Sequence, residues 1–235
     1  WNAVIGLSLA RTSPDLARAV CPPLVDATDR SPITTSTAIV SCIRNEDAAT
    51  VGRNLDVMIE GLVASGAADR FHVYVLSDSH WPEVIAAEEA RVRELAERWH
   101  DRMGVTYRRR AENPGFKAGN IRDFCERWGH RHDFMLVLDA DSLMEADVIL
   151  RMVRTLQQAP QLGILQSLMA GLPTTSAFAR PLQFGMRMLM NGFTAGNAWW
   201  QQDVGPYWGH NALIRLQPFI EHCHLAPLPG RGPLA

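Results

Sequence analysis

The sequence lacks the basic excess that nucleic-acid-binding proteins usually carry. It has 23 lysines and arginines against 25 aspartates and glutamates, which gives a formal net charge of -2 at pH 7. Proteins that bind DNA or RNA owe much of their affinity to lysine and arginine contacts with phosphates. We therefore expect no nucleic-acid partner.

Cysteine is scarce and widely spaced. The four cysteines are Cys21, Cys42, Cys125 and Cys223, and no Cys-x-x-Cys pair occurs. Closely spaced cysteines are typical of disulfide frameworks and structural zinc sites. The spacing instead predicts reduced thiols, as found in a cytosolic compartment.

Long hydrophobic runs are also missing. No stretch reaches the roughly 20 apolar residues that a membrane-spanning helix needs. Residues 1–10 carry no charge, and no basic region of the kind that begins a signal peptide precedes them. Two interpretations stay open for them: a packed strand or helix, or the end of a transmembrane helix. We assign residues 1–36 to an N-terminal segment, which is of linker type from residue 11 because proline, serine, threonine and aspartate are frequent there.

The two glycine-rich loops that commonly bind nucleotide phosphates are absent. Neither GxGxxG nor GxxxxGK[ST] occurs in the sequence. In nicotinamide-dependent dehydrogenases and P-loop enzymes, these loops bring backbone amides against the phosphates. Their absence argues against both classes.

What the sequence does contain is a regular alternation of short apolar runs and longer helical patterns. Apolar residues make up 47% of the chain, which is typical of a folded globular domain. The alternation predicts an α/β fold with a mostly parallel sheet and helices on both faces. After residue 170 it gives way to a stretch rich in methionine and aromatic residues, 178–200. Strands are expected at residues 37–43, 71–76, 105–108, 134–138, 162–166 and 207–216, and helices at residues 47–65, 82–103, 118–128 and 146–158.

Acidic residues follow three of the expected strands. Glu46 and Asp47 come after the first strand and Asp78 after the second. Asp139 and Asp141 follow the most hydrophobic strand. One acidic strand end means little, because aspartate is common in turns and helix caps. Three such ends favour a ligand site, since ligands of parallel sheets bind at the carboxyl ends of the strands.

Asp139 and Asp141 form a DxD motif. In an extended chain their carboxylates face the same side, because the intervening residue points away. An acidic crevice repels phosphates unless a divalent cation lies between them, and Mg²⁺ and Mn²⁺ bind carboxylates and phosphates together. The motif therefore predicts an Mg²⁺ or Mn²⁺ site shared with a substrate diphosphate.

Two basic segments and one histidine pair have more than one interpretation. Lys117 lies in residues 115–120 (GFKAGN), just before an expected helix. It would either contact a diphosphate together with the helix-start amides or be a solvated lysine beside an ordinary helix cap. Residues 108–110 (RRR) are interpreted as a solvated surface run, with a phosphate contact as the alternative. His222 and His224 suggest a metal site, but the second ligand pair that a zinc site needs is missing.

The order of these motifs resembles the processive family-2 glycosyltransferases, which include the cellulose and hyaluronan synthases. The resemblance is closer still to the bacterial inner-membrane glucosyltransferases of osmoregulated periplasmic glucan synthesis, and it covers roughly residues 37–235. It is carried by residues 44–47 (RNED), 74–79 (YVLSDS), 117–125 (KAGNIRDFC) with 127–129 (RWG), 137–142 (VLDADS), 207–211 (YWGHN) and 218–223 (PFIEHC) leading into 225–230 (LAPLPG).

The resemblance implies a GT-A-like fold and a role for each matching residue. Asn45, Glu46 and Asp78 would hold the uridine of the donor. Lys117 would contact its diphosphate. Asp139 would lie against the ribose or the metal, and Asp141 would bind the metal. The implied reaction is metal-dependent transfer of glucose from UDP-glucose to a growing β-glucan with inversion.

The chain also departs from the family pattern. The acceptor-side catalytic aspartate, the Gln-x-x-Arg-Trp motif and the transmembrane helices are missing. We expect a donor-binding subdomain at residues 37–170, a partial acceptor-side subdomain at residues 171–235, and the catalytic base beyond Ala235. This chain would then be a fragment that binds donor without transferring it. The full-length protein would act at the cytoplasmic face of the bacterial inner membrane, on a glucan acceptor and attached through segments absent from this chain.

Two other functions stay open. A nucleotidyltransferase of similar sheet topology would need a Gly- and Arg-rich loop directly after the first strand, where residues 42–46 (CIRNE) have none. A non-catalytic nucleotide-binding module is consistent with the same residues. Turnover by the full-length protein distinguishes that module from an enzyme.

Overall fold

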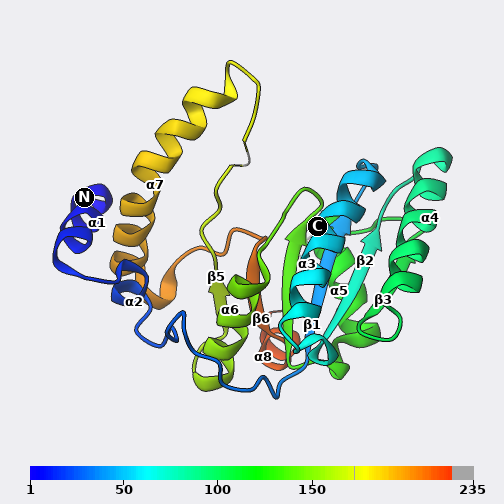
Figure 1. Cartoon of the computed structure of the whole chain (residues 1–235), viewed down its shortest axis with the longest axis horizontal. Helices are drawn as coiled ribbons and strands as arrows, with labels where there is room; N and C mark the ends of the chain where they lie inside the picture. Colours follow the sequence, from blue (N-terminus) through cyan, green and yellow to red (C-terminus); the bar gives the residue numbers. More distant parts are fainter. Residues whose placement is uncertain (172, 224–235) are drawn as a thin grey trace, which may run out of the picture. The chain divides into compact units, whose positions relative to one another are not determined.

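The computed structural model describes residues 1–171 and 173–223, and its chain divides into two compact units (Figure 1). One unit joins residues 27–165 to residues 210–223. The other joins residues 1–26 to residues 166–209. In chain order the elements are α1 (Asn2–Thr12), α2 (Leu16–Val20), β1 (Thr37–Ile43), α3 (Ala48–Ala64), η1 (Ala68–Arg70), β2 (Phe71–Ser77), α4 (Pro82–Trp99), β3 (Gly104–Arg109), α5 (Phe116–Trp128), η2 (Gly129–Arg131), β4 (Phe134–Asp139), α6 (Ala146–Gln158), β5 (Ile164–Gln166), α7 (Ala179–Gln201), η3 (Gln202–Val204), β6 (Ala212–Arg215) and α8 (Leu216–His222).

The sheet has six strands in the order β3-β2-β1-β4-β6-β5. The first four run parallel, and β6 runs antiparallel to β4. Thr37 pairs with both Phe71 and Phe134, so β1, β2 and β4 begin level with one another. They also end level, because Cys42 pairs with Leu76 on one side and Asp139 on the other. The level ends bring the loops that follow these strands to one edge of the sheet.

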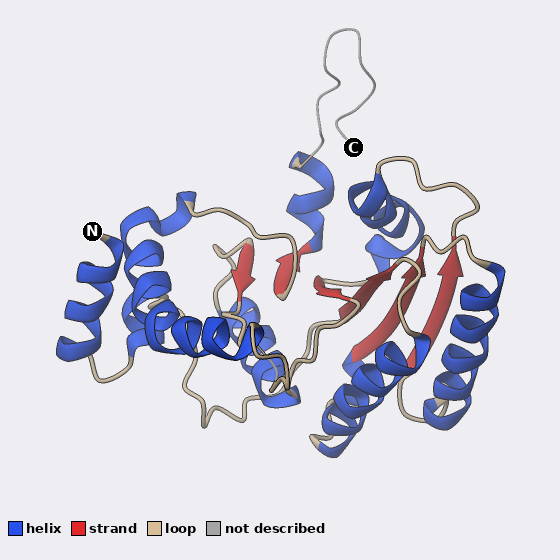
Figure 2. Cartoon of the chain, turned by 90° about the horizontal axis from the view of Figure 1, so that it is seen from above, coloured by secondary structure: helices blue, strands red, loops and turns tan. Residues whose placement is uncertain are grey.

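Helices cover both faces of the sheet, as the sequence predicts (Figure 2). Helices α3, α4 and α6 pack on one face, where Ile39, Val75 and Leu136 are fully buried beneath them. Helices α5 and α8 pack on the other face. Both faces are apolar because a parallel strand between two helical layers has no solvated side. This explains the continuous hydrophobic runs of β1 and β4.

Several element ends differ from the expected ones for local reasons. The expected strand at residues 207–216 is reduced to β6 because Gly209 and Asn211 have positive φ angles of 87° and 49°, which interrupt an extended chain. The expected helix at residues 47–65 begins at Ala48, because the Asp47 carboxylate caps it by accepting a hydrogen bond from the Thr50 amide.

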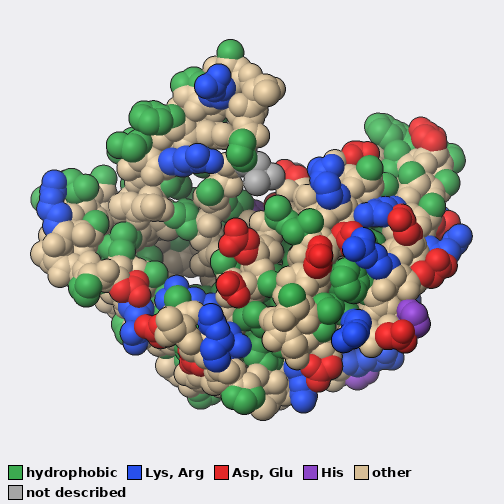
Figure 3. Space-filling view, viewed as in Figure 1, with side chains coloured by type: hydrophobic (Ala, Val, Ile, Leu, Met, Phe, Trp, Pro, Cys, Tyr) green, Lys and Arg blue, Asp and Glu red, His purple; other side chains and the backbone are tan. Residues whose placement is uncertain are grey.

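The second unit is built from α1, α2, α7 and η3. A Cβ on Gly6 would lie 1.6 Å from the Gly192 carbonyl oxygen, and one on Gly196 would lie 1.8 Å from that of Asn2. Glycine at these positions therefore permits the close approach of α1 to α7. Residues 2–10 lie in α1, and residues 178–200 lie almost entirely in α7. Helix α7 carries many hydrophobic side chains at its surface (Figure 3).

None of the helices formed by the described residues has the length and apolar character needed to cross a membrane.

Candidate functional site

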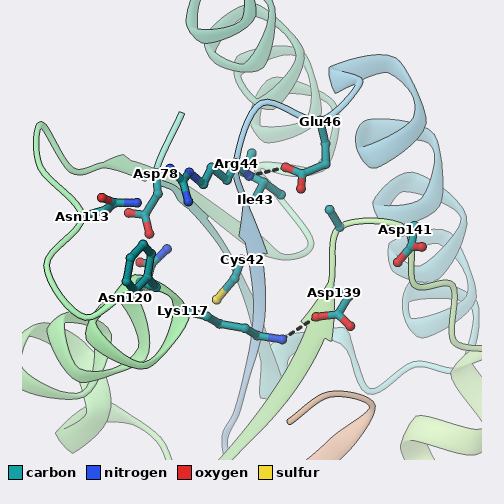
Figure 4. A pocket seen from close by; sticks show the side chains of 12 residues that line it. Cys42, Ile43, Arg44, Glu46, Asp78, Asn113, Lys117, Asn120, Asp139 and Asp141 are labelled. Atoms are coloured by element: carbon teal, nitrogen blue, oxygen red, sulfur yellow. Dashed lines mark hydrogen bonds and ion pairs between the residues drawn. The ribbon is translucent and has the colours of Figure 1, made fainter. Parts of the chain in front are cut away.

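A cavity of about 510 Å³ opens where the loops after β1, β2 and β4 meet the start of α5 (Figure 4). The level strand ends place it there, as expected for ligand sites of parallel sheets. Five of the six predicted site residues line it. Its lining residues are Cys42, Ile43, Arg44, Glu46, Asp78, Asn113, Phe116, Lys117, Asn120, Asp139, Ala140 and Asp141.

One end of the cavity holds the DxD motif. Asp139 is the last residue of β4, and its side chain is 41% exposed. Lys117, from the first turn of α5, forms an ion pair with it (Figure 4). The Nδ1 atom of His210 lies 3.9 Å from the second Asp139 oxygen. Lys117 therefore combines this ion pair with a side chain that is 38% exposed, and its contact with a diphosphate stays a prediction.

The DxD carboxylates suit a cation that is shared with a bound phosphate. Within the described residues, no group of three or more histidine, cysteine, aspartate or glutamate side chains could hold a metal ion by itself. Mg²⁺ is commonly held by one or two carboxylates together with substrate phosphates. Asp139 and Asp141 provide such a pair at the cavity (Figure 4). Their chemistry fits a cation that arrives with a diphosphate better than a metal centre made of protein ligands alone.

Asp78 and Asn113 lie at the opposite end of the cavity (Figure 4). The Asp78 carboxylate is buried, and its two oxygens accept hydrogen bonds from Nε and Nη2 of Arg110, each at 2.7 Å. Arg110 also donates to the carbonyl oxygens of Pro114 and Phe116, at 3.1 and 3.0 Å. One guanidinium therefore joins the end of β2 to the loop that precedes α5.

The interpretation of residues 108–110 as a solvated run is wrong for two of the three arginines. Arg108 forms an ion pair with Asp123 at 3.0 Å, and Arg110 pairs with Asp78. Only Arg109 is exposed. The reason is the alternation of an extended chain, which places Arg108 and Arg110 on one side and Arg109 on the other.

Asn45 is the predicted site residue that does not line the cavity. It has a φ angle of 60°, and its side-chain oxygen accepts a hydrogen bond from the His80 amide at 3.0 Å. The backbone amide of Asn45 donates a hydrogen bond to Ser79 Oγ at 2.7 Å. Asn45 thus joins the loop after β1 to the loop after β2. Its predicted role toward uridine, like the roles of the other five predicted site residues, stays a prediction.

Three further residues of the cavity were not identified from the sequence. Phe116 is 55% exposed, and the Arg44 guanidinium lies 5.9 Å from its ring centre. Asn120 is buried, and it donates to the Leu76 carbonyl oxygen at 3.0 Å. The turn signal Asn-Pro-Gly at residues 113–115 could have identified Asn113, because such turns place loop residues near strand ends.

We assign no catalytic role to the Cys42 thiol or to His222. Burial raises the pKa of the Cys42 thiol to about 12, so the thiol at the cavity wall is protonated at neutral pH and is a poor nucleophile. His222 is exposed, with its Nε2 3.8 Å from Glu221. His224 and the sequence 225–230 lie outside the described residues.

The family of this chain follows from its sequence together with this geometry. Residues 38–223 match the sequence pattern of glycosyl transferase family 2. The chain belongs to that family. Its sheet and helices are similar to those of the mannosyltransferase PcManGT from Pyrobaculum calidifontis, solved in complex with GDP-Man and Mn2+. The TM-score is 0.58 at 16% identity, over 100% of this chain and 62% of that one. The family-2 chain therefore has a GT-A-like fold.

Closer relatives share a biosynthetic name. Glucans biosynthesis glucosyltransferase H of Pseudomonas paraeruginosa is 43% identical over 199 residues, which cover 85% of this chain and 23% of the relative. The protein of the same name from Enterobacter sp. is 44% identical over 85% of this chain and 24% of the relative. This family-2 chain thus spans about a quarter of the length of the curated relatives it matches.

Proposed function

We propose that the full-length protein transfers glucose from UDP-glucose to a growing β-glucan, and that this chain carries the donor site. The observation that carries the proposal is the cavity, which has a cationic Lys117 and the DxD carboxylates at one end and Asp78 at the other. A nucleotide sugar presents the matching order of groups, with a nucleoside on one side of a diphosphate. The name of the relatives supports a glucan as the product.

The two ends of the cavity would bind different parts of the donor. The diphosphate would lie beside Lys117 with an Mg²⁺ or Mn²⁺ ion held by Asp139 and Asp141. The uridine would lie toward Asp78 and Asn113, where the exposed ring of Phe116 offers a face for stacking. Lys117 would exchange its ion pair with Asp139 for contact with the diphosphate when the donor enters.

Transfer with inversion requires an acceptor hydroxyl to attack the anomeric carbon from the side opposite the diphosphate. A base must remove the proton from that hydroxyl, and such a base typically contributes about 10²–10⁴-fold to the rate. A bound divalent cation would stabilise the charge that develops on the leaving diphosphate. The cavity carboxylates are assigned to nucleotide and cation, so none of them is assigned as the base.

The same reasoning gives a cellular setting for the full-length protein. We place it at the cytoplasmic face of the bacterial inner membrane, where UDP-glucose is available. Its attachment would come through segments outside this chain. The resemblance to inner-membrane glucan synthases, together with the relatives named for glucan biosynthesis, supports this placement.

Calorimetry with UDP tests the donor site directly. We expect UDP to bind this chain in Mn²⁺ or Mg²⁺ and to bind much more weakly in EDTA, because the acidic end repels phosphate without a cation. Asp141→Asn should weaken metal-dependent binding at least roughly tenfold, since loss of even an outer partner of a metal ligand often costs that much. UDP-glucose turnover by the full-length protein, with this chain alone for comparison, tests the activity.

Asp47→Asn is the matched control. It makes the same chemical change on a residue that caps α3 outside the cavity. Its metal-dependent UDP affinity should stay near that of the unaltered chain. Equal UDP affinity in EDTA, or equal losses in the two folded variants, would contradict the proposed cation site.

A further inference from the structure

Glu88 is a buried carboxylate beneath the cavity loops. It lies on α4 with only 2% of its surface exposed, and it does not line the cavity. Its Oε2 accepts hydrogen bonds from Ser77 Oγ at 2.6 Å and from the Tyr107 hydroxyl at 2.9 Å. Its Oε1 accepts one from Ser79 Oγ at 2.5 Å. Across the part of the chain that the structure describes, no lysine, arginine or histidine forms an ion pair with it.

The hydrogen bonds to Glu88 have a fixed direction. Ser77 Oγ accepts from the Ser79 amide at 3.1 Å, and Ser79 Oγ accepts from the Asn45 amide at 2.7 Å. A backbone amide can only donate, so each serine gives its own hydroxyl hydrogen to the carboxylate. The two relays therefore run from amide to hydroxyl to Glu88. Each relay ends at the Glu88 carboxylate, which accepts the hydrogen bonds of both serines and of Tyr107.

Both relays begin in loops that line the cavity. Asp78 lies between Ser77 and Ser79, and Asn45 lies between the cavity residues Arg44 and Glu46. A single carboxylate on α4 thus fixes the loop after β2 directly and the loop after β1 through Ser79. Buried networks of this kind are costly to disrupt, because a donor left without its acceptor loses a strong bond in a poorly solvated place.

We propose that Glu88 is a positioning residue for the donor nucleotide, holding the Asp78 loop and the Asn45 loop in register through Ser77 and Ser79. This inference rests on the proposed function, since it takes the cavity to be the nucleotide site. Glu88 touches neither nucleotide nor cation, and it acts on affinity only through the two loops.

Tyr107 offers a comparison within the same network. Its hydroxyl bonds to Glu88 from β3, and it holds neither cavity loop. Tyr107→Phe removes a hydrogen bond from the carboxylate and should lower thermal stability while leaving the UDP dissociation constant within about twofold. Ser79→Ala removes the link between Glu88 and Asn45, and it should weaken UDP binding by roughly tenfold, as expected for about two hydrogen bonds.

Glu88→Gln tests the carboxylate itself. The amide nitrogen would face hydroxyl groups that are already donating, so the relay cannot be kept intact. We expect a loss of UDP affinity at least as large as that of Ser79→Ala, because the amide disturbs both relays. The double variant should lose no more affinity than Glu88→Gln alone, because the Ser79 relay is already broken in that variant. Glu89→Gln, a neighbouring exposed glutamate on the same helix, should leave both stability and affinity unchanged.

The experiment is titration calorimetry of this chain with UDP and Mn²⁺, with melting temperatures measured in parallel. If Glu88→Gln fails to fold, the comparison of Ser79→Ala with Tyr107→Phe decides the question. UDP binding that is equally tight in those two variants would refute the positioning role alone. Absence of UDP binding by the unaltered chain would refute the proposed function, and the positioning role would fall with it.

Discussion

The pair formed by Arg110 and Asp78 gives a prediction whose size follows from the structure. Their side chains are only 10% and 5% exposed, and two hydrogen bonds of 2.7 Å join them. Arg110→Met removes the guanidinium and leaves the Asp78 carboxylate buried without a countercharge. Loss of one partner of a buried pair typically costs about 3–5 kcal/mol. Because the pair lies at a cavity that water can enter, we expect the lower end, about 3 kcal/mol.

Urea unfolding followed by circular dichroism measures this loss. For a dependence on urea of about 2 kcal/mol per molar, a loss of about 3 kcal/mol lowers the midpoint by roughly 1.5 M. Arg109→Met is the control, because Arg109 is the exposed neighbour and surface changes usually stay within about 0.5 kcal/mol. The double variant Arg110→Met with Asp78→Asn should be more stable than Arg110→Met alone, since the unpaired charge is gone. An Arg110→Met midpoint equal to that of Arg109→Met would refute the reasoning.

Two further predictions concern a buried histidine and the cysteine thiols. Burial holds the pKa of His132 at about 4, below its ordinary value of 6.5, so the unfolded chain takes up a proton first as the pH falls between these values. Stability should therefore fall from pH 6.5 toward pH 4, and unfolding curves of His132→Gln should show a shallower fall; equal slopes would contradict this assignment. Burial also raises the pKa of Cys42 to about 12 and that of Cys125 to about 11, whereas Cys223 is exposed. Iodoacetamide at neutral pH should label Cys223 first, and mass spectrometry showing equally fast labelling of Cys42 would contradict it.

Much of the sheet could be predicted because its signals are local. The apolar, β-branched run of β1 reports a strand buried on both faces, and the predicted bounds equal the observed ones. The acidic strand ends could be brought together for the same reason, since parallel strands that begin level also end level. Asp78, Asp139 and Asp141 therefore line one cavity as expected.

The partners of the site residues were harder to predict, because they depend on the chain's path in space. The sequence alone indicates that Arg110 belongs to a charged surface run. In the structure it pairs with Asp78, which lies at the end of the neighbouring strand. Asn45 looks like a ligand residue by position, yet its side chain bonds to the next loop. Nothing in the sequence indicates that Glu88 is buried, since a glutamate in a charged helix is ordinarily solvated.

Helix α7 shows a different limit of sequence patterns. Only Ala195 and Gly196 are buried in it, while large apolar side chains such as Leu189 and Trp200 are exposed. An amphipathic helix is recognised by an apolar stripe that faces the core. Here the buried positions are small residues, so the stripe is missing and the segment gave no helical prediction.

The place of β6 between β4 and β5 has a consequence for synthesis on the ribosome. The hydrogen-bonding edge of β4 that faces β6 has no strand to pair with until Ala212–Arg215 has left the exit tunnel, after α6, β5 and α7. An unpaired edge on so hydrophobic a strand is a template for pairing with another chain. During synthesis there is therefore a period in which aggregation competes with folding, and this period ends only when β6 pairs with β4.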